Sequence, residues 1–156
     1  MIIGEKIPAF HLPDETGKII SSEQIFHDKF VVLFFYPKDN TSGCIKEVCA
    51  FRDSHQDFLD SGCEVVGVSG DTVASHALFA DKHRLPYTLL SDINGVLRKD
   101  MRVPKKIFGL IPGRVTYIFN PKGELIHIIN DMMDSERHIK EALEIIKGQD
   151  RLTNDA

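Results

Sequence analysis

The chain of 156 residues has few cysteines, no long apolar segment and no excess of positive charge. Its longest apolar run, residues 30–36, is 7 residues long, whereas a membrane-spanning helix needs about 20. Lys and Arg total 19 against 23 Asp and Glu, and the net charge is −4. A nucleic-acid binder normally carries a basic excess. We therefore expect neither a membrane-spanning protein nor a nucleic-acid partner.

Targeting, metal-binding and nucleotide-binding patterns are also missing. Residues 1–6 show no secretory signal, and the three cysteines are too few, and odd in number, for a disulfide framework. We therefore expect reduced thiols and a cytoplasmic location. The sequence has no H-x-x-x-H or C-x-x-C pair and no Gly-rich nucleotide motif. Neither a metal nor an organic cofactor is expected.

The length and the hydrophobic content of 42% are typical of one globular domain with a real core. We expect this domain to cover residues 1–148. The polar composition of residues 149–156 predicts a flexible C-terminal tail.

Apolar strand patterns alternate with helical ones along the chain. Residues 30–36, 63–69 and 115–119 are continuous β-prone runs, as expected of strands buried on both faces of a sheet. From residue 42 or 43 to residue 59, apolar side chains recur at helical spacing. A turn at residues 120–123 predicts a late hairpin.

This order of elements predicts an α/β protein with a mixed central sheet flanked by helices. It is compatible with a thioredoxin-like fold that carries an N-terminal β-hairpin around a turn at residues 14–17. Periodicity alone leaves a small flavodoxin-like sheet open.

One cysteine, Cys44, lies where a loop from a central strand enters a helix, the sheet edge where α/β folds place their sites. Backbone N–H groups and the helix dipole stabilise a thiolate there. Thr41 offers a hydroxyl, and Pro37 restricts the loop. Ser42 is the expected N-cap. We interpret this arrangement as a thiolate with polar groups for a small, oxygen-rich substrate.

A second cysteine, Cys49, follows Cys44 by five residues. In an intact helix this spacing separates the two Cα atoms by roughly 8.6 Å, whereas a disulfide needs less than about 7 Å. The spacing predicts either no disulfide or a redox-coupled unwinding of the helix. Cys63, at the start of a strand, is interpreted as a buried structural thiol.

These residues resemble the active site of the peroxiredoxins. Pro37, Thr41 and Cys44 match the motif P-x-x-x-T/S-x-x-C, and the pattern F-Y-P-K-D-x-T, G-C, E, F-R-D resembles the bacterioferritin comigratory protein or peroxiredoxin Q subfamily. Further similar segments follow in order at residues 67–71, 90–92 and 113–119. The chain departs from the subfamily pattern T-P-G-C-T by having Ser at position 42 and Ile at position 45.

The resemblance implies a role for each residue. Cys44 would be the peroxidatic nucleophile that becomes a sulfenic acid. Thr41 would bind the peroxide, Pro37 would shield the pocket, and Arg114 would stabilise negative charge. Cys49 would be the resolving cysteine, forming an intramolecular disulfide that thioredoxin or glutaredoxin reduces.

Glu47 and Arg52 are expected around Arg114. The implied protein is a cofactor-free monomer or weak dimer that reduces hydrogen peroxide and alkyl hydroperoxides. A thioredoxin-like disulfide reductase is a rival interpretation, but it needs a cysteine at position 47. A redox sensor or chaperone-like binding module with little turnover is the other alternative.

Overall fold

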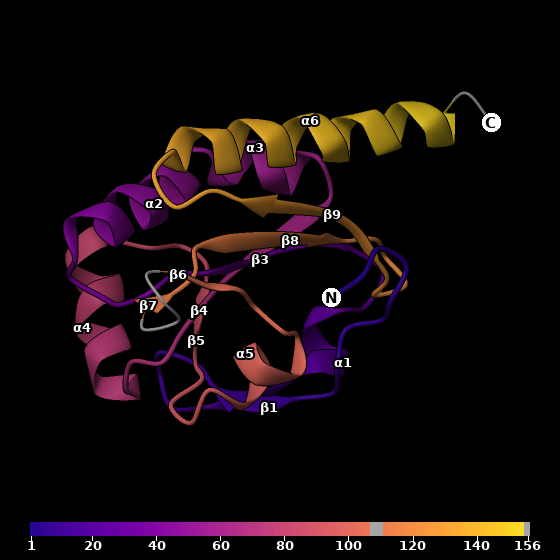
Figure 1. The fold of residues 1–156 in the computed structure, drawn as a ribbon. Helices are drawn as coiled ribbons and strands as arrows, with labels where there is room; N and C mark the ends of the chain where they lie inside the picture. Colours follow the sequence, from indigo (N-terminus) through magenta and orange to yellow (C-terminus); the bar gives the residue numbers. More distant parts are fainter. Residues whose placement is uncertain (107–110, 155–156) are drawn as a thin grey trace.

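A five-stranded sheet forms the centre of the computed structural model, which describes residues 1–106 and 111–154 (Figure 1). The strand order is β5-β4-β3-β8-β9. The strands are β3 (Phe30–Phe35), β4 (Cys63–Ser69), β5 (Thr88–Ser91), β8 (Val115–Phe119) and β9 (Leu125–Asn130). β3, β4 and β5 are parallel, whereas β8 and β9 run antiparallel to their neighbours. This confirms the mixed sheet, and the antiparallel half excludes a flavodoxin-like sheet.

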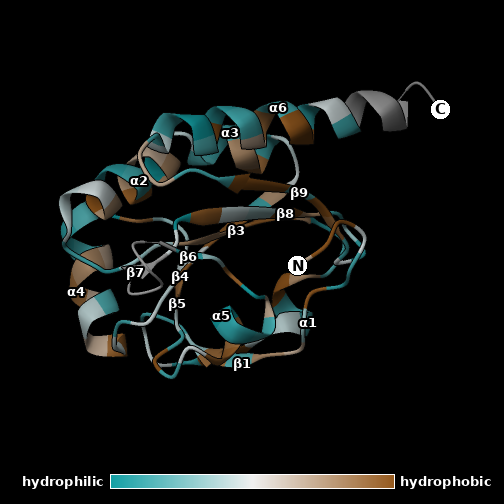
Figure 2. Ribbon diagram, viewed as in Figure 1, coloured by the Kyte–Doolittle hydropathy of each residue, from teal (hydrophilic) through white to brown (hydrophobic). Residues whose placement is uncertain are grey.

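The apolar run of β3 is buried because both faces of the central strand are covered. Val32 and Phe34 point into one core, and Val31 and Leu33 point into the other; all four have no exposed surface. Successive side chains of a strand alternate between faces, so a strand inside a three-layer protein must be apolar throughout. Figure 2 shows this as brown colour along the strands.

Helices cover the two faces of the sheet unequally (Figure 1). The longer helices pack on one face: α2 (Ser42–Asp53), α3 (His55–Asp60), α4 (Val73–His83) and α6 (Ser135–Asn154). The other face is covered by α1 (Ser22–Ile25), α5 (Val96–Asp100) and the N-terminal segment. The helix expected to run to residue 59 is divided into α2 and α3 at Ser54.

Two short antiparallel pairs lie outside the main sheet. β1 (His11–Pro13) and β2 (Ile19–Ser21) form the expected N-terminal hairpin. Its turn is held by Asp14, whose side chain accepts the backbone N–H groups of Thr16 and Lys18. β6 (Lys105–Lys106) and β7 (Ile111–Pro112) form a ribbon that the sequence did not suggest.

The last helix extends further than the sequence analysis expected. α6 continues past Gly148 to Asn154, so the backbone of residues 149–154 is helical where a flexible tail was expected. The remaining two positions, 155–156, lie outside the described residues. Among the described residues, no helix has the length and hydropathy needed to cross a bilayer.

Candidate active site

Cys44 lies in the first turn of α2, directly after the loop that leaves β3. Its side chain has no exposed surface. The first turn of a helix leaves backbone N–H groups without intrahelical acceptors, and its dipole favours negative charge. The N-cap is Thr41 rather than the expected Ser42, and the Thr41 side chain makes no capping hydrogen bond. Backbone groups at this end of α2 therefore remain free to stabilise a thiolate.

Arg114 brings a positive charge to this sulfur. It directly precedes β8, and the pairing of Phe35 with Val115 places it beside the loop that follows β3. Arg114 Nη2 donates to Cys44 Sγ at 3.4 Å, and Nη1 donates to the Gly43 carbonyl at 3.2 Å. Nε donates to the Met132 carbonyl at 3.3 Å. These bonds hold the guanidinium against the sulfur.

Gly43 is part of this arrangement, although the sequence analysis gave it no role. A Cβ atom at position 43 would lie 3.0 Å from Arg114 Nη2. The missing side chain therefore lets the guanidinium approach the start of α2. The only sequence signal for this role is the position of Gly43 immediately before the cysteine.

Glu47, which has no exposed surface, forms an ion pair with the buried Arg114. Burial raises the pKa of Glu47 to about 7, although Arg114 opposes this rise. Burial alone would lower the pKa of Arg114, but its interactions with Glu47 and Cys44 outweigh burial and raise it. The guanidinium therefore stays charged beside the sulfur.

A histidine extends this buried group on its far side. Glu47 Oε1 has no hydrogen-bond partner among the described residues, and His138 Nδ1 lies 3.8 Å away. The same Nδ1 is 2.7 Å from the Thr116 hydroxyl, and Nε2 is 2.7 Å from the Asp131 carbonyl. The sequence analysis gave no role to His138 or Thr116, and both lie far from Cys44 in the chain.

Thr41 and Pro37 lie in the loop between β3 and α2. Thr41 is exposed, and its hydroxyl donates to the Lys38 carbonyl at 2.9 Å. The Thr41 oxygen therefore keeps its lone pairs available to accept a hydrogen bond. Pro37 is half-buried at the start of the same loop.

Asp39 anchors this loop to the rest of the molecule. Its carboxylate accepts from the hydroxyls of Tyr36 at 2.6 Å and Ser75 at 2.9 Å, and it lies 2.7 Å from His76 Nδ1. Its backbone N–H donates to the Asp71 carboxylate at 2.8 Å. Burial acts to raise the pKa of Asp39, but these hydrogen bonds outweigh burial and lower it.

Asp39, Asp71 and His76 also form a group of potential metal ligands, since their donor atoms lie within 4.8 Å of one another. Each of these side chains already takes part in hydrogen bonds. His76 Nε2, for example, lies 3.1 Å from the Leu90 carbonyl. We interpret the group as an internal network that holds the loop.

Cys49 faces a different part of the molecule from Cys44. It is half-buried on α2, and its Sγ lies 3.8 Å from Nδ1 of His83, the last residue of α4. Both cysteines are free thiols. Arg52 was expected near Arg114, but it instead donates to the His83 carbonyl at 2.8 Å and to Asp53 at 3.0 Å. Arg52 lies one helical turn beyond Cys49, so it shares the α4 side of α2 rather than the Arg114 side.

The third cysteine is part of the core. Cys63, at the start of β4, is 2% exposed, and its thiol donates to the Glu64 carbonyl at 3.4 Å. Burial raises the pKa of Cys63 to about 12. This agrees with the expectation of a structural thiol.

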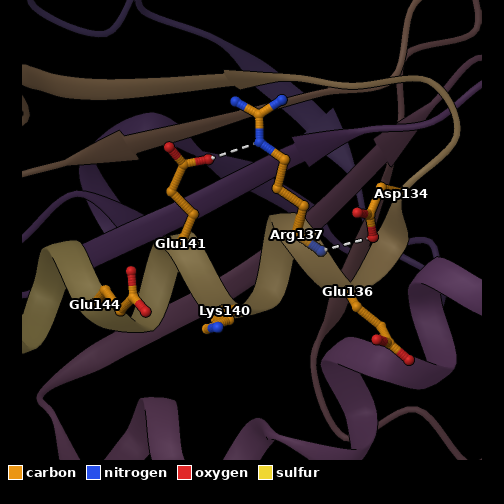
Figure 3. Close-up of a pocket in the computed structure, with 6 residues that line it drawn as sticks. All are labelled: Asp134, Glu136, Arg137, Lys140, Glu141 and Glu144. Carbon is orange, nitrogen blue, oxygen red and sulfur yellow. Dashed lines mark hydrogen bonds and ion pairs between the residues drawn. The ribbon is translucent and has the colours of Figure 1, made fainter.

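A separate charged cavity of about 550 Å³ lies on the surface at the start of α6 (Figure 3). The residues that line it are Asp134, Glu136, Arg137, Lys140, Glu141 and Glu144. Arg137 is already paired, since its Nε donates to Glu141 at 3.2 Å and its backbone N–H to Asp134 at 3.0 Å. This cavity has the mixed charges of a solvated helix surface, and we assign it no part in the chemistry.

Comparison with known proteins identifies the family. Residues 3–128 match the model of the AhpC/TSA family, and the chain belongs to it. It is 49% identical over 145 residues to wheat chloroplastic peroxiredoxin Q, and 48% identical to the Arabidopsis thaliana protein of that name. Each alignment covers 93% of this chain and, respectively, 66% and 67% of the relative. The chain thus spans about two thirds of the length of these relatives.

Solved structures give the same assignment over nearly whole chains. The structure of peroxidoxin BcpB from Mycobacterium tuberculosis is similar with a TM-score of 0.87 and 33% identity, covering 95% of this chain and 97% of that one. A peroxiredoxin Q mutant from Xylella fastidiosa matches with a TM-score of 0.87 and 27% identity, covering 96% and 97%. The thioredoxin-like fold and the resemblance to the peroxiredoxin Q group are confirmed. The chain is a peroxiredoxin, and peroxiredoxins are thiol-dependent oxidoreductases.

The same comparison corrects the expected location. The relatives from wheat, poplar and Arabidopsis thaliana are named chloroplastic, not cytoplasmic. The expectation of a cytoplasmic location is therefore wrong. It failed because the charge, hydropathy and cysteine count of a folded domain do not record its compartment.

Proposed function

We propose that this protein reduces hydrogen peroxide and small alkyl hydroperoxides with Cys44 as the nucleophile. The observation that carries this proposal is the position of the Cys44 sulfur, at the N-terminus of α2 and 3.4 Å from Arg114 Nη2. Both the helix dipole and the guanidinium stabilise a thiolate there. The match to peroxiredoxins Q supports the same chemistry.

In the first step, the Cys44 thiolate attacks one peroxide oxygen and the O–O bond breaks. The sulfur becomes a sulfenic acid, and the other oxygen leaves as water or an alcohol after it takes a proton. Arg114 stabilises the negative charge that develops on the leaving oxygen. The Thr41 oxygen accepts the hydrogen bond of the peroxide O–H, since its own proton is donated to Lys38. Because Cys44 is buried, nearby side chains must move to admit the peroxide.

In the second step, the Cys49 thiolate attacks the sulfenic sulfur of Cys44. A disulfide forms, and the sulfenic oxygen leaves as water. Cys44 and Cys49 lie on one continuous helix, in which their Cα atoms are roughly 8.6 Å apart. The disulfide therefore requires the first turns of α2 to unwind.

In the last step, an external dithiol reduces the disulfide by thiol–disulfide exchange. We propose thioredoxin or glutaredoxin for this role and a monomer or weak dimer as the acting species. Pro37 shields the pocket on the loop side. Glu47, through its ion pair with Arg114, orients the guanidinium.

One experiment tests these steps together. The reduced protein receives one equivalent of hydrogen peroxide, and free thiols are counted and located by peptide mapping. We expect rapid loss of two thiols, with Cys44 joined to Cys49. Cys44→Ser should abolish peroxide consumption. Cys49→Ser should leave one sulfenic acid per chain and stop turnover with thioredoxin.

The buried thiol provides the control, since Cys63→Ser should leave both oxidation and turnover intact. Loss of only the Cys44 thiol in the native protein would indicate a one-cysteine enzyme. Retained turnover in Cys49→Ser would move the resolving role to Cys63 or to an external thiol. No reaction within minutes would leave the fold standing and reject the proposed function in favour of a binding module.

A further inference from the structure

The partner of Cys49 is a histidine that the peroxidatic site does not use. His83 ends α4, and its Nδ1 lies 3.8 Å from Cys49 Sγ, within the range for a hydrogen bond to sulfur. Two contacts hold the imidazole in place. Arg52 Nη1 donates to the His83 backbone carbonyl at 2.8 Å, and the ring of Phe79 meets the imidazole edge-on at 4.9 Å.

The other imidazole nitrogen of His83 is buried without a hydrogen-bond partner among the described residues. Buried polar atoms in folded proteins are nearly always satisfied, so this nitrogen is unusual. The sulfur of Cys49 is the polar side-chain contact that the structure gives this imidazole. The ring therefore presents one nitrogen to a thiol that, in the proposed reaction, must lose its proton.

Burial, together with the charged groups around His83, keeps its imidazole neutral. Burial lowers the pKa of His83, and the positive charges of Lys82 on α4 and Arg52 on α2 lower it further. Asp53 is bound to Arg52. The Tyr87 hydroxyl donates to the Val48 carbonyl, and burial keeps the pKa of Tyr87 well above its ordinary value. At neutral pH the imidazole is thus available as a proton acceptor.

We propose, resting on the function proposed above, that His83 is the catalytic base of the disulfide-forming step. Nδ1 takes the thiol proton of Cys49, and the resulting thiolate attacks the sulfenic sulfur of Cys44. The S–S bond forms as the S–O bond breaks, and the departing hydroxide becomes water by taking a proton. The proton on His83 then passes to solvent, so the step consumes no other reactant.

The geometry suits a base that acts before α2 unwinds. Cys49 contacts His83 only while the helix is intact, and it must leave this position to reach Cys44. Forming the thiolate in the folded helix supplies the nucleophile at the moment of opening. Once the thiolate has left, Arg52 and Lys82 destabilise the imidazolium, which returns the base to its neutral form.

The test separates the two chemical steps in time. Reduced native protein and the His83→Gln variant are mixed with one equivalent of hydrogen peroxide at pH 5.5–8.5. Samples are quenched with acid, and mass spectrometry follows sulfenic acid and disulfide. We expect Cys44 oxidation to be unchanged in the variant, whereas disulfide formation at pH 7 falls by about tenfold or more. The variant's disulfide rate should then rise in proportion to hydroxide concentration, because only solvent removes the proton.

The matched control is His55→Gln on the neighbouring helix α3. His55 is also half-buried with a pKa lowered by burial, but its ring lies against Tyr87. His55→Gln should leave both Cys44 oxidation and disulfide formation unchanged. A second measurement does not depend on helix opening: in Cys44→Ser protein, adding His83→Gln should slow the alkylation of Cys49 by iodoacetamide at pH 7.

Other outcomes overturn the proposal. Native disulfide rates and pH profile in His83→Gln would mean that the contact is incidental. A parallel fall in Cys44 oxidation and disulfide formation would assign His83 a structural role instead. Failure of the native protein to oxidise Cys44 at all would reject the peroxidase function itself, which is a separate result.

Discussion

At the scale of single residues, the candidate site depends on close contacts that side-chain identity alone does not announce. Gly43 shows this, because the site depends on the side chain that glycine lacks. A Cβ there would stand 3.0 Å from Arg114 Nη2, and the guanidinium is the group that meets the Cys44 sulfur. The motif therefore carries a steric requirement next to its chemical one.

Gly43→Ala should slow Cys44 oxidation without lowering the stability of the protein. Alanine favours a helix over glycine by up to about 1 kcal/mol, so we expect the free energy of unfolding to stay level or rise. The rate of Cys44 oxidation should fall about threefold to tenfold, because the guanidinium must retreat by a few tenths of an ångström. Competition kinetics with a reference peroxidase measures the rate. Gly148→Ala in α6, which meets open space, should leave the rate unchanged.

Glu47 predicts a pH dependence of stability. Burial raises its pKa from 4.5 to about 7, so the folded state favours the protonated carboxyl. The stabilisation of the folded state by this raised pKa is complete below pH 4.5 and is lost as the pH rises through 7. In Glu47→Gln, which cannot ionise, the fall in unfolding free energy between pH 5 and pH 8 should be smaller by on the order of 3 kcal/mol.

Denaturant titrations at the two pH values measure this difference. Glu144→Gln, at an exposed position on α6, is the control and should titrate like the native protein. Identical pH profiles for Glu47→Gln and the native protein would show that Glu47 is ionised throughout and would remove the basis of the prediction.

At the scale of elements, the proposed reaction requires two opposing conformations of α2. Intact, it presents its N-terminus and Cys44 to Arg114; in the proposed reaction it must unwind before Cys49 can reach Cys44. The Tyr87 hydroxyl donates to the Val48 carbonyl at 2.5 Å, which ties the middle of α2 to the segment before β5. This bond stabilises the intact form, so the free energy of opening is set partly outside the helix.

Tyr87→Phe should therefore shift the balance toward opening. Loss of this hydrogen bond costs about 1 kcal/mol of stability. We expect disulfide formation to become several-fold faster while Cys44 oxidation stays constant, as followed by acid quench and mass spectrometry. Tyr117→Phe, in the core on the opposite face of the sheet, is the matched hydroxyl deletion. Equal effects of the two substitutions would contradict a specific tie to α2.

At the scale of the whole molecule, the Asp39 network joins the active-site loop to two other parts of the chain. Asp39 contacts Ser75 and His76 on α4, and its N–H is bound by Asp71 after β4. Side chains from separate elements thus hold one loop. Because the carboxylate is buried, removing its charge leaves His76 with a weakened partner.

Asp39→Asn should lower the free energy of unfolding by about 3 kcal/mol and should also reduce the rate of Cys44 oxidation, since Thr41 lies on the same loop. The pKa of Asp39 is lowered from 3.8, so its contribution is present above that pH and is lost as the pH falls through the folded value. Thermal melts at pH 7 should show the full loss, and melts near pH 3 a smaller one. Asp81 is exposed on α4, so Asp81→Asn should change neither the free energy of unfolding nor the rate of Cys44 oxidation.

The fold and the position of the candidate nucleophile, Cys44, could be predicted from the sequence because their signals are local. The continuous apolar run of β3 predicts a strand covered on both faces, and the strand–loop–helix pattern places Cys44 at a helix N-terminus. The spacing of Cys44 and Cys49 in a helix predicts that they do not meet without unwinding. The extent of α6 was missed, because polar composition does not by itself end a helix.

The sequence by itself determined the class of the molecule and pointed to Cys44 as the proposed nucleophile, since periodicity, turns and a short motif act over a few residues. The family resemblance had already given Arg114 a role, but only the tertiary structure shows how distant side chains reach the two cysteines. Arg114 reaches Cys44 because β3 pairs with β8, and His83 reaches Cys49 because α4 ends beside α2. Arg52 was placed wrongly for the same reason. Contacts between residues far apart in the chain arise from packing, and no local pattern encodes them.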